Sequence, residues 1–77
     1  MGKNMQIIEI NTEYIKMDQL IKFAGIVVNG SDAKFMIADG LVRVNGELCT
    51  QRGKKIRNGD IVEIQDFDTL EVKGPLS

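Results

Sequence analysis

The chain has 77 residues, 43% of them hydrophobic and 27% charged, with a net charge of −1. This composition is typical of a folded globular protein, and one domain of this length buries only roughly 60% of its unfolded surface, which excludes a large enclosed pocket. Its apolar runs fall well short of the roughly 20 residues that span a bilayer. Residues 1–10 contain no signal-peptide core, and the single Cys49 agrees with a reducing compartment. We therefore expect a cytoplasmic monomer.

Charge is unevenly distributed along the chain. From Lys34 to Arg57 six cations stand against two anions, a local balance of +4, so the rest of the chain carries −5. The acidic surplus lies before residue 19 and between Asp60 and Glu71. Because a polyanion responds to the distribution of charge more than to its sum, the pattern predicts a polarised molecule with one basic face.

The first half of the chain predicts one strand and two helices. Residues 6–10 alternate weakly and are rich in isoleucine, which indicates a short strand. Residues 17–24 place apolar side chains at the i, i+3, i+4, i+7 spacing of one helical face, and Gly25 ends that helix. Asn29 is an N-cap candidate for a second helix, with an acid three residues later as in a capping box. The second helix is expected to bury Ala33, Met36 and Ile37 and to end at Gly40.

The second half predicts strands separated by tight turns. Residues 41–44 alternate as a strand, Asn45-Gly46 is the strongest hairpin signal in the chain, and residues 47–50 return antiparallel. Residues 51–55 are polar and basic, and Ile56 offers one apolar anchor. A turn at residues 58–60 then leads to strands over residues 61–64 and 70–72.

Few residue types that carry catalysis are present. The chain has no histidine, which excludes histidine-based acid–base catalysis and histidine metal ligation. Cys49 has no neighbouring base, so an inert, partly buried thiol is favoured over a nucleophile. Asp66, Asp68 and Glu71 could hold a divalent cation, but without EF-hand spacing a solvated acidic edge is the better interpretation. The glycines form no nucleotide-binding motif. We therefore expect no catalytic residues, no cofactor and no metal.

Six cations form the remaining candidate site. Phosphate contacts need long cationic side chains on a common surface, and a helix, the following strand and a basic loop could assemble one. A solvated charge run is the alternative, and composition alone favours it, because basic loops are common on proteins that bind no nucleic acid. The six residues are Lys34, Arg43, Arg52, Lys54, Lys55 and Arg57, the last four expected in one loop.

An ordered series of residues from 16 to 60 resembles a known family. The series is Lys16-Met17-Asp18, Leu20, Gly25, Ala33-Lys34, Met36-Ile37, Gly40-Leu41-Val42-Arg43-Val44-Asn45-Gly46 and Gly59-Asp60. In this order and with these gaps it resembles the S4 RNA-binding domain, whose G-x-V-x-V-N-G pattern is the most specific part. Residues 30–34, 44–47 and 52–55 further resemble the small stand-alone S4 proteins of bacteria, in which the domain is the whole protein. The chain departs from the family pattern at Asn29-Gly30, where many members have Ser or Thr followed by Arg, and at Lys16, where arginine is usual.

The resemblance implies an α+β protein with the S4-type (αL) fold, in which two helices pack on a small, mostly antiparallel sheet. It implies a single domain over residues 1–77, with a core motif at 16–64 and a tail at 65–77. It further implies a non-catalytic protein that binds structured RNA, such as rRNA or a tRNA-like element, through a basic helix-loop surface. The expected contacts are Lys16, Lys34, Arg43, Arg52, Lys54, Lys55 and Arg57.

Two alternatives remain open at this stage. A protein-interaction adaptor could dock on a ribosomal or nucleic-acid-processing partner through the basic face or the acidic tail, and an enzyme is a distant third. Among single residues, Asn45 is expected to serve the turn and Asp60 to bond its own turn backbone. Phe35 is expected to be partly buried against the N-terminal strand rather than stacked on a base, and Tyr14 is undecided between these roles.

Overall fold

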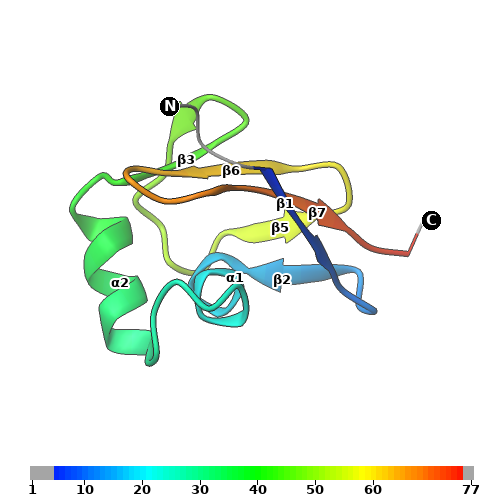
Figure 1. The fold of residues 1–77 in the computed structure, drawn as a ribbon, viewed down its shortest axis with the longest axis horizontal. Coiled ribbons are helices and arrows are strands. Elements are labelled where there is room, and N and C mark those ends of the chain that lie inside the picture. The colour runs from blue at the N-terminus through cyan, green and yellow to red at the C-terminus, as the bar shows by residue number, and fades with distance from the viewer. Residues whose placement is uncertain (1–4, 76–77) are drawn as a thin grey trace.

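A computed structural model describes residues 5–75 of the chain as seven strands and two helices (Figure 1). The expected tail residues 76–77 and residues 1–4 lie outside the described part. The elements in chain order are β1 (Met5–Glu9), β2 (Tyr14–Lys16), α1 (Met17–Phe23), α2 (Gly30–Ala38), β3 (Val42–Val44), β4 (Glu47–Leu48), β5 (Lys55–Arg57), β6 (Ile61–Ile64) and β7 (Thr69–Lys73).

The strands form two sheets. Five of them make a sheet of order β1-β7-β6-β3-β4, in which β1 and β7 are parallel and the other neighbours antiparallel. β2 and β5 make a separate antiparallel pair. Both helices and the β2–β5 pair lie on the same side of the five-stranded sheet (Figure 1). The α+β class and the mostly antiparallel sheet are thus as expected, and β7 lies inside the sheet rather than in a tail.

The core fills the space between the large sheet and the elements on that side. Each helix contributes its apolar stripe, and each long strand contributes alternate residues, as the period of two requires. Burying one such aliphatic side chain stabilises the fold by about 1.5–3 kcal/mol relative to exposing it. The fully buried side chains are Met17, Leu20, Ile21, Ala33, Ile37, Val42, Ile56, Val62, Ile64, Leu70 and Val72.

The predicted helix boundaries are confirmed by their caps. The side-chain oxygen of Asn29 accepts a hydrogen bond from the Asp32 amide at 3.1 Å, which is the expected N-cap of α2. Gly25 and Gly40 follow the two helices with φ of 80° and 77°, a left-handed conformation that costs glycine little.

The hairpin predicted at Asn45-Gly46 is also confirmed, since both residues have positive φ, 52° and 87°, as a type I′ turn requires. The structure adds a role for the Asn45 side chain. Its Nδ2 donates to Asp60 Oδ1 at 3.1 Å and its Oδ1 accepts from the Ile61 amide at 2.9 Å. Asp60 Oδ2 in turn accepts from the Arg57 amide at 2.8 Å, as expected for its turn. The two turns are therefore joined by one asparagine.

Two expectations were wrong in detail. Residues 55–57 form strand β5 rather than part of a loop, because Tyr14–Lys16 supplies a partner strand that the sequence did not indicate. Phe35 is 65% exposed instead of packed against the N-terminal strand. Phe35 is two residues from both Ala33 and Ile37, so it points to the opposite side of α2 from these buried side chains.

Candidate nucleic-acid interface

The β2–β5 pair has one apolar and one cationic face. Ile15 and Ile56 are register partners on the inner face, where Ile56 is fully buried. Because side chains alternate across a strand, the residues on either side of these two point outward. The outward register pairs are Tyr14 with Arg57 and Lys16 with Lys55.

The pair formed by Lys16 and Lys55 brings like charges together. Residues directly opposite each other in an antiparallel pair have Cβ atoms about 4.5–5.5 Å apart, and like charges there destabilise the sheet by roughly 0.2–1 kcal/mol. Both lysines are exposed, so solvent and salt reduce the repulsion. A bound anion would turn this local repulsion into attraction.

Tyr14 lies within the same group of cations. Its ring centroid is 4.9 Å from Lys55 Nζ and 5.7 Å from Arg57 Cζ, both within cation–π range. Arg57 is its direct register partner and Lys55 its diagonal neighbour, which accounts for both contacts. No local pattern in the sequence associates Tyr14 with these cations, because about 40 residues separate them along the chain.

The loop that carries Arg52 and Lys54 folds over the first turn of α1. Lys54 O accepts from the Met17 amide at 2.9 Å and Arg52 O accepts from the Asp18 amide at 3.1 Å. The loop itself is a turn closed by Lys54 N and Gln51 O at 3.2 Å. Two of the amides that begin α1 are thereby satisfied by backbone carbonyls in place of a side-chain cap.

These contacts define what we call the basic face: the outer side of β2–β5 together with the adjoining loop of residues 51–54. Five of the seven predicted contacts belong to it, and all five are exposed. Carboxylates also adjoin it: that of Asp18 accepts from the Gln19 amide at 2.8 Å, and that of Asp60 accepts from the Arg57 amide at 2.8 Å. The five cations are Lys16, Arg52, Lys54, Lys55 and Arg57.

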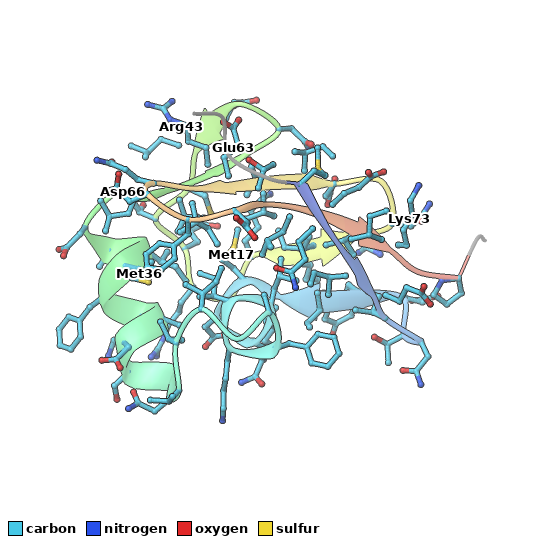
Figure 2. All side chains as sticks on the ribbon, in the orientation of Figure 1. Met17, Met36, Arg43, Glu63, Asp66 and Lys73 are labelled. Carbon is cyan, nitrogen blue, oxygen red and sulfur yellow. The ribbon has the colours of Figure 1, made fainter. Side chains whose placement is uncertain are left out.

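The remaining two predicted contacts are on other elements. Lys34 is exposed on α2, which packs against α1. Arg43 stands between the buried Val42 and Val44, so it points to the other side of the large sheet. There it is the register partner of Glu63, and Figure 2 shows both on the far side of the sheet from Met17. Arg43 is thus separated by the large sheet from the cations of the basic face, with which it was expected to share one surface.

The Cys49 thiol and the acidic side chains were the other groups that could carry chemistry. The Cys49 thiol is 6% exposed and donates to Gln51 O at 3.6 Å, consistent with a structural side chain. Among residues 5–75, no cluster of three or more acidic, cysteine or histidine side chains is placed to hold a metal ion. No helix within that range is long and apolar enough to cross a membrane.

Comparison with known proteins identifies the family of the chain. A family model of the S4 domain matches residues 8–73, which include every element from β2 to β7. The chain is also similar to the probable ribosome maturation protein RlbA of Bacillus subtilis (strain 168). The two are 38% identical over 65 residues, which cover 84% of this chain and 92% of that protein. The chain belongs to the S4 domain family.

Proposed function

We propose that this protein binds structured RNA through the basic face and does so in the maturation of ribosomes. The observation that carries the proposal is the gathering of five exposed cations from β2, β5 and the 51–54 loop onto one surface of an S4 domain. Support for the ribosomal setting comes from the name of the similar Bacillus protein. The protein's role is to bind, and we assign it no reaction.

The chemistry of the basic face suits phosphates better than bases. Lysine and arginine side chains bind phosphate oxygens at any sequence, and an A-form duplex keeps its major-groove base edges out of reach. Stacking platforms need several exposed aromatic rings, whereas the ring nearest these cations, Tyr14, is half-buried. The protein is therefore expected to recognise the shape of a folded RNA more than its sequence.

Counterion release predicts how strongly RNA binding depends on salt concentration. If about four of the five cations neutralise phosphates, the logarithm of the binding constant falls with a slope of roughly −3 to −4 against the logarithm of salt concentration. A tenfold rise in salt then weakens binding by three to four orders of magnitude. A flat salt profile would contradict the proposal.

A matched pair of charge reversals tests whether RNA binds at the basic face. Lys55→Glu removes a cation from the basic face, and Arg43→Glu makes the same charge change on the other side of the large sheet. Binding of each variant to a ribosomal RNA helix is measured by fluorescence anisotropy at several salt concentrations. We expect Lys55→Glu to weaken binding at least tenfold and to flatten the salt slope by about one or more. Equal losses in the two variants would refute the assignment to this face.

A protein-docking function is the second candidate, and a specific observation favours it. Ile7 and Leu48 are each 56% exposed on the side of the large sheet opposite the helices, where Arg43 and Glu63 also lie. Exposed aliphatic side chains beside charges are typical of contact surfaces. Crosslinked pull-down with and without RNase separates the two functions, because partners that survive RNase treatment indicate docking on protein.

A further inference from the structure

We propose that Tyr14 is a positioning residue that holds Lys55 and Arg57 as a preformed pair of phosphate-binding cations. This inference rests on the proposed RNA-binding function and deepens it. Tyr14 is assigned no contact with RNA; it acts through the two cations. The juxtaposition that carries the inference is one ring with two cationic groups within 6 Å of its centroid, all on one strand pair.

The position of Tyr14 is fixed by the backbone around it. β2 is only three residues long, but its register with β5 places Tyr14 directly opposite Arg57. Just before the strand, the Thr12 hydroxyl donates to the Tyr14 carbonyl at 2.8 Å, which holds the chain where β2 begins. The neighbouring Ile15 faces the core and pairs with the buried Ile56. The ring is thus held on a strand that is anchored from the inner side.

Among residues 5–75, no ion pair or side-chain hydrogen bond holds the Lys55 or Arg57 side chain at the surface. Lysine and arginine side chains are long, and ordering one on binding weakens association by about 2- to 10-fold. A ring whose negative face attracts both groups restricts them before RNA arrives. It also offsets the repulsion that Lys55 meets from Arg57 on its own strand and from Lys16 opposite. The face is therefore organised for phosphate in the free protein.

Engagement with two cations also argues against a stacking role for Tyr14. A nucleobase that stacks on the Tyr14 ring would compete for space with the two cations, which lie 4.9 and 5.7 Å from the ring centroid. Base stacking and cation positioning predict different behaviour when the cations are removed. A stacked tyrosine would contribute to RNA binding with or without Lys55 and Arg57, whereas a positioning tyrosine would contribute only with them.

The experiment is a cycle of variants measured against one ribosomal RNA helix at fixed salt. Tyr14→Leu is made in the wild-type chain and in the Lys55→Gln/Arg57→Gln chain. Tyr14→Phe serves as the conservative variant, because it keeps the ring and loses only the hydroxyl. Thermal unfolding confirms that each chain is folded. We expect Tyr14→Leu to weaken binding by about 3- to 10-fold in the wild-type chain, and to change it less than twofold in the chain without the two cations.

A second arm keeps the test decisive if leucine at position 14 impairs folding. Phenylalanines carrying increasing numbers of fluorine atoms keep the ring size while removing its negative face, so binding should weaken stepwise along the series. Tyr14→Phe should bind as the wild-type chain does.

Each remaining result overturns a stated claim. If Tyr14→Leu or the fluorinated series binds like wild type, the positioning role is wrong while RNA binding stands. If Tyr14→Leu weakens binding equally with and without the two cations, Tyr14 contacts RNA directly and the inference is wrong. If the wild-type chain shows no salt-dependent RNA binding, the proposed function fails and this inference fails with it.

Discussion

Replacement of Asn45 tests whether one side chain joins the turn before β4 to the turn before β6. Asn45 makes two hydrogen bonds, one to the Asp60 carboxylate and one to the Ile61 amide, and it does so at a φ of 52°. Two variants separate these features. Asn45→Gly removes both hydrogen bonds but tolerates the positive φ, whereas Asn45→Ala removes the bonds and adds backbone strain.

The expected losses follow from these contacts. A hydrogen bond of this kind contributes about 0.5–1.5 kcal/mol net, so losing two in Asn45→Gly should lower the free energy of unfolding by about 1–3 kcal/mol. A non-glycine residue in the left-handed region costs roughly 1 kcal/mol more, which brings Asn45→Ala to about 2–4 kcal/mol. For a domain of this size, 1 kcal/mol corresponds to roughly 4–8 °C in Tm.

Urea unfolding followed by circular dichroism measures both variants. Asn11→Ala is the matched control, since Asn11 is exposed in a bend before β2 and has no side-chain hydrogen bond within residues 5–75. The control should stay within about 0.5 kcal/mol of wild type. The reasoning is refuted if Asn45→Gly is as stable as wild type, or if glycine and alanine at position 45 are equally destabilising.

Three further predictions concern single side chains. Ile56→Ala should destabilise the fold by about 2–5 kcal/mol in urea unfolding, because Ile56 is fully buried; a loss below 1 kcal/mol would mean that β5 does not pack as described. Lys16→Gln should raise the free energy of unfolding by roughly 0.2–0.5 kcal/mol, because it removes the repulsion from Lys55; a destabilised variant would contradict this. The same variant should flatten the salt slope of RNA binding by about one, because it removes a phosphate contact. Phe35→Ala should change stability by less than about 1 kcal/mol in thermal unfolding, and a larger loss would restore the expectation that Phe35 packs.

The elements that the sequence predicted are those with local signals. α1 and α2 have apolar stripes and a glycine after each end, and the Asn45-Gly46 turn needs positive φ at both positions. β6 was predicted with its bounds, residues 61–64, because a turn precedes it and its residues alternate. These signals depend on neighbouring residues alone, and a single sequence contains them.

The strand pair β2–β5 could not be predicted in the same way. Each strand has three residues, too few for alternation to be distinguished from chance, and their pairing joins parts of the chain some 40 residues apart. The location of the candidate site depends on that pairing. Without it, the sequence leaves Tyr14 undecided between burial and base stacking, and it groups Arg43 with cations that lie on the other side of the large sheet.

The charge pattern predicted a basic face but not its composition. Charge counting along the chain selects residues 34–57 as one block, whereas the fold exposes alternate residues of a strand on opposite sides. Arg43 alternates with two buried valines, so it lies outside the basic face although it belongs to the 34–57 block. Lys16 lies outside that block in sequence, but its register with Lys55 places it on the basic face. Placement in three dimensions thus required the sheet register, which composition does not contain.

Amide chemical-shift mapping during titration with a ribosomal RNA helix tests the central claim most directly. The basic face predicts that the largest shifts fall on β2, β5 and residues 51–54, and that they disappear as salt is raised. β1, β3 and β7 serve as internal controls, because their outward residues lie on the other side of the large sheet. Shifts concentrated on those three strands, or shifts that persist at high salt, would contradict RNA binding through the basic face.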